Sequence, residues 1–66
     1  MGLNERQILA ITYLKQHPTI TNNVYQEICN TSERTALRDL DQLIDLNLLV
    51  KQGEKKGTFY QLKHGG

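Results

Sequence analysis

The sequence predicts an α+β domain that consists of three helices and a small antiparallel sheet. Three segments, 5–16, 22–29 and 33–46, carry apolar residues at the three- and four-residue spacing of helices that bury one face. Two later segments, 48–52 and 58–62, have the composition of strands and flank a turn with a glycine at each end, which is typical of a hairpin. The predicted order is helix, short strand, helix, helix, strand, hairpin tip and strand.

The 66 residues are enough for one small domain, which we place at residues 3–63, with 1–2 and 64–66 as flexible ends. The 8 basic and 7 acidic residues leave a net charge of +1, so any affinity for nucleic acid must come from local clustering of charge. No apolar run approaches the roughly 20 residues of a membrane span, and the N-terminus lacks a signal region. We therefore expect a cytoplasmic protein that does not bind membranes.

The residue types that carry catalysis or bind metals are scarce. Cys29 is the one cysteine, and His17 and His64 are the two histidines. His17 precedes the proline that ends the first helix, and His64 lies in the C-terminal tail, so no nucleophile–base pair and no metal-ligand spacing can be assembled. We therefore expect no enzymatic activity, no metal and no cofactor. Cys29 is expected to be a small buried apolar residue.

The first helix begins with a capping box. Asn4 can cap it, and Gln7, three residues later, can return a hydrogen bond to the backbone of the cap. The helix is expected to run to about Gln16, because the residue before Pro18 is disfavoured in the α region. Apolar residues cover most of its circumference, so it is expected to be largely buried or to meet a second protein through part of its surface. These residues are Leu9, Ala10, Ile11, Tyr13 and Leu14.

A minimal strand precedes the second helix. Residues 19–21 are expected to form this strand with Ile20 pointing inward, and Thr21 or Asn22 caps the helix that follows. The apolar residues of the second helix recur at the spacing of a core-facing side. They are Val24, Tyr25, Ile28 and Cys29.

Asn30, Thr31 and Ser32 make the turn between the second and third helices. Asparagine tolerates the left-handed conformation that ends a helix, and Asn47 is expected to end the third helix in the same way. Ser32 stands where an N-cap of the third helix belongs. Two helices joined by so short a turn form a helix-turn-helix.

The third helix has an apolar face and a polar face. At 100° per residue, its apolar residues fall within an arc of about 120°. They are Ala36, Leu37, Leu40, Leu43 and Ile44. Arg34, Thr35, Arg38 and Gln42 lie opposite, so two guanidinium groups, a hydroxyl and an amide project from one stripe. Such a stripe is either an ordinary solvated helix surface or a surface that recognises a ligand.

This order of elements is that of the winged helix-turn-helix, and several motifs support the resemblance. The third helix, with Ser32, Thr35, Arg38-Asp39-Leu40 and Leu43 followed by Leu48-Leu49, resembles the helix-turn-helix of DeoR-type bacterial repressors. The span 3–62 is similar to the C-terminal winged-helix domain of RecG-like transcriptional regulators with an AlbA-type domain and of some Fic-family proteins. The motifs that carry this similarity are Leu3-Asn4-Glu5-Arg6-Gln7, Ile20-Thr21-Asn22, Ser32 to Leu43 and Gly57-Thr58-Phe59-Tyr60.

The sequence departs from the pattern of these families at a few positions. Asn30 and Asn47 stand where glycine is usual, and Thr31 stands where an apolar residue is usual. Asparagine accepts the same backbone conformation as glycine at some cost. The later half of the third helix is acidic, which opposes DNA phosphates and also the negative end of the helix dipole. The acidic residues are Asp39, Asp41 and Asp45, and of these Asp39 is interpreted as structural rather than functional.

The resemblance implies a DNA-binding module of a bacterial or archaeal transcriptional regulator. The third helix would enter the major groove, with its two arginines on guanine or phosphate and its threonine and glutamine on base edges. The two lysines of the wing would contact the DNA backbone, and the N-termini of the second and third helices would take phosphate oxygens. The expected DNA-binding residues are Thr21, Ser32, Arg34, Thr35, Arg38, Gln42, Lys55 and Lys56.

Each of these assignments has an alternative. The two arginines can instead form ion pairs with Asp41 and Asp45 on the same helix, and two lysines are common at a solvated hairpin tip. The near-zero net charge favours a second hypothesis, a protein-interaction or autoregulatory module at the C-terminus of a larger protein that does not bind DNA. If double-stranded DNA is the partner, one copy neutralises few phosphates, and useful affinity requires a homodimer or a larger parent protein.

Overall fold

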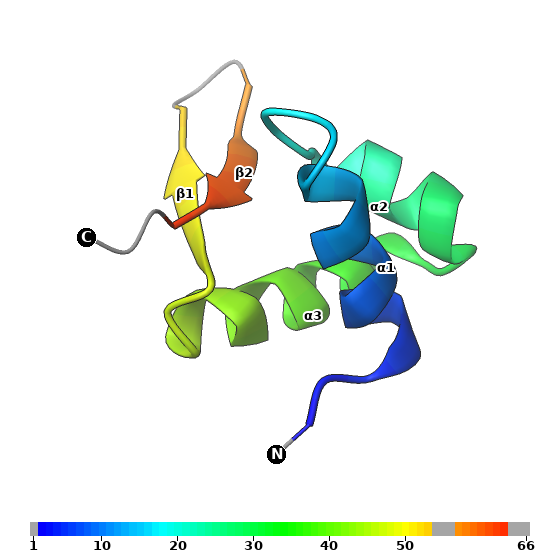
Figure 1. Ribbon diagram of the computed structural model, residues 1–66. Coiled ribbons are helices and arrows are strands. Elements are labelled where there is room, and N and C mark those ends of the chain that lie inside the picture. The colour runs from blue at the N-terminus through cyan, green and yellow to red at the C-terminus, as the bar shows by residue number, and fades with distance from the viewer. Residues whose placement is uncertain (1, 54–56, 64–66) are drawn as a thin grey trace.

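A computed structural model describes residues 2–53 and 57–63 of the chain. The described residues form three helices, α1 (Glu5–Leu14), α2 (Asn22–Cys29) and α3 (Glu33–Asp45), and two strands, β1 (Leu49–Gln52) and β2 (Phe59–Leu62) (Figure 1). The predicted α+β class is therefore confirmed, with the elements in the predicted order. Lys55 and Lys56 and the C-terminal tail lie outside the described residues, and the domain limits stay a prediction.

The predicted N-caps of the helices are present. The Asn4 side chain accepts a hydrogen bond from the backbone N–H of Gln7 at 2.8 Å, and the Gln7 side chain accepts one from the backbone N–H of Asn4 at 3.0 Å. Thr21, the first of the two predicted candidates, caps α2, and Ser32 caps α3. Each cap satisfies an N–H group that the first helical turn cannot bond internally.

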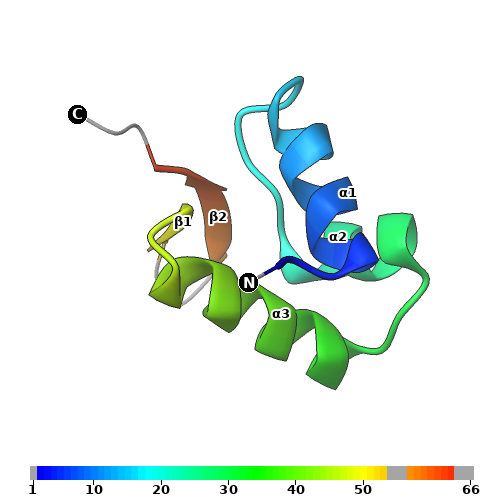
Figure 2. The same ribbon diagram turned by 60° about the horizontal axis from the view of Figure 1, so that its bottom comes forward.

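The turn between α2 and α3 depends on one left-handed residue. Asn30 has φ 52° and ψ 56°, and Asn47 after α3 has φ 63°, as the sequence predicted for both. Because the chain reverses within the few residues between Cys29 and Glu33, α2 and α3 lie against each other as a helix-turn-helix (Figure 2). The structure thus has the helix pair followed by a hairpin.

The sheet is smaller than the sequence suggested. β1 and β2 are antiparallel, with Leu49 opposite Leu62 and Gln52 opposite Phe59. The predicted strand at 19–21 is reduced to a single bridge, in which Ile20 and Tyr60 exchange two hydrogen bonds of 2.8 Å. Pairing stops there because Pro18 has no N–H to donate on one side and α2 begins at Asn22 on the other.

The core lies between the three helices and one face of the hairpin. α1 and α3 both pack on the sheet, and α2 packs on both of the other helices. The buried apolar residues are Ala10, Leu14, Ile20, Tyr25, Ala36, Leu40, Leu43, Leu49 and Tyr60. Every helix and strand therefore contributes at least one buried side chain. Ile20 lies outside these elements and joins the core through its bridge to Tyr60 on β2.

Three predictions about burial need correction. Leu37, predicted in the core, is 45% exposed, and Leu9 on α1 is 49% exposed. The first helix is consequently not largely buried, and contact between part of it and a second protein stays a prediction. Cys29 is only partly buried, and its thiol lies 3.3 Å from the carbonyl oxygen of Arg6 as a hydrogen-bond donor. α1 also ends at Leu14 rather than at Gln16.

Within residues 2–53 and 57–63, no helix combines the length and the apolar character needed to cross a bilayer.

The backbone at Gly53, directly after β1, gives a stability prediction. Gly53 has φ +95°, and a Cβ atom placed on it would collide with the backbone carbonyl of Gly57. Gly53→Ala is therefore expected to lower the free energy of unfolding by more than about 1 kcal/mol, since both the backbone angle and the close approach exclude a side chain. Urea unfolding measures this difference.

The matched control is Gly57→Ala at the other end of the same turn. A Cβ atom at Gly57 meets nothing within 4 Å, and φ there is not in the left-handed region. We expect a change within about 0.5 kcal/mol for this variant. Equal effects of the two substitutions would contradict the role assigned to Gly53.

Candidate nucleic-acid interface

A buried carboxylate joins the three helices behind the outer face of α3. The Oδ2 atom of Asp39 accepts hydrogen bonds from Arg6 Nε at 2.6 Å and from the Tyr25 hydroxyl at 2.8 Å. Its Oδ1 atom accepts one from Asn4 Nδ2 at 3.2 Å and one from Arg6 Nη2 at 3.3 Å. Asn4 and Arg6 belong to the start of α1, and Tyr25 belongs to α2. We call these four residues the helix junction.

The helix junction holds Asp39 in its charged form. Burial by itself raises the pKa of a carboxyl group, but the hydrogen bonds from Arg6, Tyr25 and Asn4 together outweigh burial and hold the pKa of Asp39 below its ordinary value. The bond to Asp39 raises the pKa of Arg6. Burial, followed by the bond to the carboxylate, raises the pKa of Tyr25. At neutral pH the junction is therefore an ion pair with a neutral phenol as an additional donor.

The helix junction also sets the rotation of α3 about its own axis. The buried residues of α3 are Ala36, Asp39, Leu40 and Leu43. At 100° per residue, the centre of this buried arc is rotated about the helix axis by about 50° from the centre of the arc predicted from apolar residues alone. Leu37 is consequently turned toward solvent. The prediction was wrong because it sorted residues by hydrophobicity, whereas a charge with good hydrogen-bond partners can be buried.

Gln42, predicted to contact base edges, lies on the side of α3 that faces α1. Gln7 Nε2 donates a hydrogen bond to the carbonyl oxygen of Asp39 at 3.2 Å and to Gln42 Oε1 at 3.1 Å. The amide oxygen of Gln42 is thus engaged, and the side chain remains exposed to solvent. Its position is at the edge of the outer face rather than at its centre.

The outer face of α3 carries charges of both signs. Arg34 and Arg38 are exposed, and neither has a carboxylate within 4.0 Å in residues 2–53 and 57–63, so the ion pairs weighed as an alternative are not formed there. Asp41 and Asp45 are exposed on the same face. Asp39 was predicted to oppose phosphates with them but was interpreted as structural rather than functional, and it is buried in the helix junction. The arginines therefore share this face with two carboxylates.

The remaining predicted contacts are at the helix N-termini. Ser32 Oγ accepts a hydrogen bond from the backbone N–H of Thr35 at 3.2 Å and donates one to Thr35 Oγ1 at 3.1 Å. Thr21 accepts a hydrogen bond from the backbone N–H of Val24 at 3.2 Å. These hydroxyl groups stabilise the first turns of α3 and α2, and their role toward a ligand stays a prediction. Lys55 and Lys56 lie outside the described residues.

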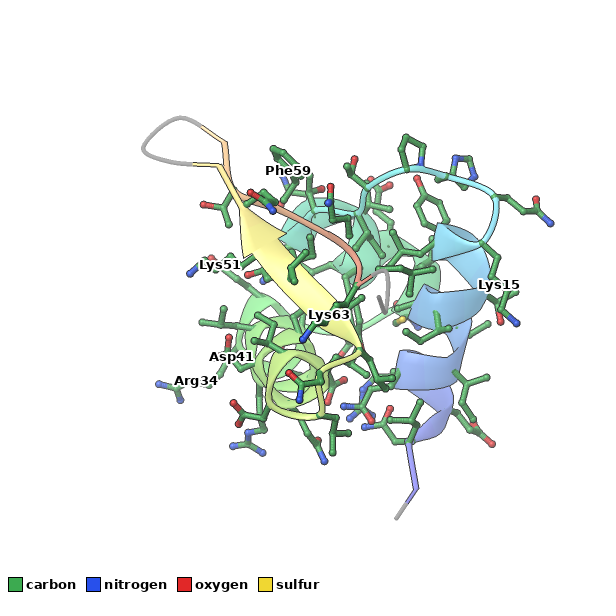
Figure 3. All side chains as sticks on the ribbon, turned by 60° about the vertical axis from the view of Figure 1, so that its left-hand side comes forward. Lys15, Arg34, Asp41, Lys51, Phe59 and Lys63 are labelled. Atoms are coloured by element: carbon green, nitrogen blue, oxygen red, sulfur yellow. The ribbon has the colours of Figure 1, made fainter. Side chains whose placement is uncertain are left out.

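Lys51 is a cation near this face that the sequence analysis missed. It lies opposite Tyr60 in the hairpin register and is exposed. Figure 3 shows Arg34, Asp41 and Lys51 on one side of the molecule and Lys15 on the other. Burial raises the pKa of Tyr60, and the negative charge of Asp41 raises it further. A single lysine in a strand gives no sequence signal of this proximity.

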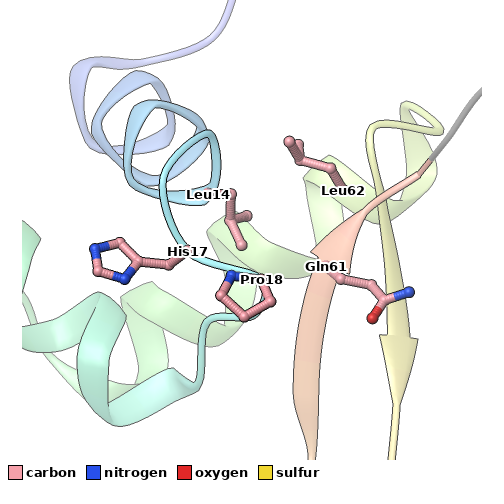
Figure 4. A pocket seen from close by; sticks show the side chains of 5 residues that line it. All are labelled: Leu14, His17, Pro18, Gln61 and Leu62. Carbon is pink, nitrogen blue, oxygen red and sulfur yellow. The ribbon is translucent and has the colours of Figure 1, made fainter.

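A hollow between the end of α1 and β2 lies on another part of the surface. It has a volume of about 240 Å³ and is lined by Leu14, His17, Pro18, Gln61 and Leu62 (Figure 4). The imidazole of His17 points away from β2 in this view and stacks on Tyr13, with ring centroids 4.0 Å apart. Among the described residues, no group of three His, Cys, Asp or Glu side chains is placed to hold a metal ion.

Comparison with known proteins supports the fold. No known protein family and no curated protein matches the sequence. Among solved structures, the DIP2311 protein from Corynebacterium diphtheriae superposes with a TM-score of 0.84 over 92% of this chain, at 23% sequence identity. The matched region is 11% of that chain, so the present chain spans a small part of its length. The likeness shows a shared fold of three helices and a two-stranded sheet.

The helix junction gives a prediction about stability. Asp39→Ala is expected to lower the free energy of unfolding at neutral pH by about 2–3 kcal/mol, because it leaves the Tyr25 hydroxyl and the Arg6 guanidinium without their acceptor. The side chain of Arg6 is 39% exposed, so water replaces part of what it loses. Asp41→Ala, which removes an exposed carboxylate from the same helix, is the matched control, with an expected change within about 0.5 kcal/mol.

Urea unfolding at several pH values tests the electrostatic origin of this effect. The folded-state pKa of Asp39 lies below its ordinary value of 3.8. Its contribution is therefore fully present above that value and is lost as the pH falls through the folded-state pKa. The difference between wild type and Asp39→Ala should be constant between about pH 5 and 7 and shrink below about pH 4. A difference that does not change with pH would contradict this account.

Proposed function

We propose that this chain is a winged helix-turn-helix module that binds double-stranded DNA within a bacterial or archaeal transcriptional regulator in the cytoplasm. The observation that supports this most directly is the outer face of α3. Arg34 and Arg38 stand one turn apart on it, both exposed, and neither is paired with a carboxylate in the described ranges. Guanidinium groups in this state are the donors that major-groove recognition uses most often.

The geometry suggests how α3 would meet DNA. Its N-terminal half would enter the major groove first, with Arg34 and Arg38 on guanine edges or phosphates. The capped N-terminus at Ser32 carries the positive end of the helix dipole, which favours a phosphate nearby. Lys51 would contact the backbone beside the groove, and the C-terminal half of α3, with its two exposed aspartates, would tilt away from the phosphates.

The helix junction would make this face ready for binding. Because Asp39 fixes the rotation of α3 against α1 and α2, the arginines need no rearrangement of the helix to reach a ligand. Preorganised donors of this kind lose less entropy on binding than donors on a mobile segment. The few cations of one copy nevertheless predict weak and steeply salt-dependent binding, which several copies in a larger parent protein would strengthen.

A second candidate function is a protein-interaction or autoregulatory module of a larger protein. Three exposed leucines favour it, namely Leu37, Leu46 and Leu48. Leu37 lies on the same helix surface as the exposed Asp41 and Asp45, so this surface is partly apolar and partly acidic. A mixed apolar and acidic surface is better suited to a protein than to a phosphate backbone. In this case DNA would not bind at any salt concentration.

A comparison of arginine variants on duplex DNA tests the first proposal. The double substitution Arg34→Ala, Arg38→Ala is expected to weaken binding of a labelled generic duplex. The slope of log K against log salt should fall by about 1 for each of the two arginines that contacts a phosphate, and so by at most about 2. Fluorescence anisotropy at low and at moderate salt measures both quantities. Circular dichroism checks that the variant is folded.

The matched control removes a lysine from the opposite side of the molecule. Lys15→Ala takes away one positive charge far from α3 (Figure 3) and should leave both affinity and slope nearly unchanged. A lysine variant that lowers affinity and slope by half as much as the double arginine variant, which removes twice the charge, would mean that DNA responds only to net charge. Absence of binding by the wild type at low salt would overturn the proposal and leave the protein-interaction module.

A further inference from the structure

The outer face of α1 is an apolar surface without a partner in the described structure. Ile8 and Leu9 are 52% and 49% exposed, although both lie in the middle of a helix. Thr12, one turn after Ile8, is also exposed, and its hydroxyl donates a hydrogen bond of 2.9 Å to the carbonyl oxygen of Ile8. The hydroxyl is therefore satisfied within the helix, and little of this stripe requires water.

The charges at the two ends of this stripe are opposite. Glu5 lies in the first turn, and Lys15 follows the last residue of α1 with helical angles of φ −71° and ψ −20°. At 100° and 1.5 Å per residue, Glu5 and Lys15 project within about 80° of each other and are separated by about 15 Å along the axis. Both side chains are exposed. The face is thus negative at one end, apolar in the middle and positive at the other end.

A shallow hollow marks the negative end. It has a volume of about 300 Å³ and is lined by Glu5, Ile8 and Leu9. Apolar walls with a carboxylate at one edge fit a long aliphatic side chain that ends in a cation, because the stem can cover apolar surface while the charge meets the carboxylate. Lys15 of the same chain cannot reach this hollow, since it lies at the other end of the same straight helix.

We propose that a second copy of this chain docks antiparallel on the outer face of α1, with the second copy's Lys15 in the hollow at Glu5. A two-fold axis passes near Ala10 of both copies. Each residue of one α1 then faces the residue of the other α1 that lies equally far from Ala10 in the opposite direction. Glu5 then faces Lys15 twice, and Ile8 faces Thr12 twice. The charged ends and the apolar middle of the stripe each find a complementary partner in this arrangement, which is the self-complementarity that a two-fold interface requires.

This interface is small and lies away from the candidate DNA surface. One helix face on each copy buries less area than a permanent dimer needs, so the association is weak and concentration-dependent. Lys15 and Arg34 are on opposite sides of the molecule (Figure 3), so the pair leaves both α3 faces exposed and directed away from each other. Such a pair would not place two α3 helices on one side of the same duplex, and the proposal does not depend on DNA binding.

Charge reversal tests the arrangement. Sedimentation equilibrium between about 20 μM and about 1 mM covers the range of a weak complex. Glu5→Lys and Lys15→Glu each place like charges opposite each other twice, and each alone should weaken self-association about tenfold. An equimolar mixture of the two variants restores opposite charges at both contacts and should recover the wild-type association. Circular dichroism checks that both variants are folded.

Ile8→Gln provides an independent variant that leaves the charges unchanged. It keeps a good helix-forming residue on an exposed position and removes apolar contact, so it should weaken association without loss of helix signal. Recovery in the mixture together with weakening by Ile8→Gln supports the antiparallel pair. A wild type that remains monomeric at the highest concentration, variants that associate as well as the wild type, or a mixture that does not recover would overturn it.

Discussion

The carboxylate of Asp39 is the group on which the arrangement of the helices depends. It accepts hydrogen bonds from the cap and first turn of α1, through Asn4 and Arg6, and from α2, through Tyr25. In a chain of 66 residues the apolar core is small, and this charged network connects the three helices in addition to it. Such a network tolerates little rotation or sliding of α3, because either would leave a buried charge without partners.

The orientation of α3 follows from this constraint. Burial of Asp39 removes one negative charge from the outer face and turns Leu37 outward in exchange. What remains outside is a face with Arg34 and Arg38 toward the N-terminus of α3, and Asp41 and Asp45 toward its C-terminus. This polarity favours an approach to phosphates by the N-terminal half alone. It also explains why one helix can support both a DNA-binding proposal and a protein-binding alternative.

The sequence was most informative where local chemistry decides the structure. The caps at Asn4, Thr21 and Ser32 and the left-handed residues Asn30 and Asn47 were predictable, because each depends on a side chain and its own neighbouring backbone. The order of elements followed from hydrophobic periodicity. The strand at 19–21 was predicted too long, because its pairing depends on what lies beside it in the fold.

The candidate site was less predictable because it depends on contacts between distant segments. Nothing in the periodicity of α3 shows that Asp39 is buried, because its partners belong to other helices. Arg6 on α1 is 33 residues away in the sequence, and Tyr25 is on α2. Asn4, Arg6 and Gln7 at the start of α1 all donate hydrogen bonds to Asp39 on α3, and only the structure shows that these two sequence motifs are in contact. Lys51 became a candidate for the same reason.

The central claim is that the rotation of α3 fixed by Asp39 presents Arg34 and Arg38 to DNA, and a titration of the ¹⁵N-labelled protein with a short duplex tests it most directly. We expect backbone amide shifts to change in the first half of α3, around Ser32 to Arg38, and near Lys51 on β1. Amides on the outer face of α1, such as those of Ile8 and Thr12, should not change. Shifts confined to α1, or no shifts at all at low salt, would contradict the claim.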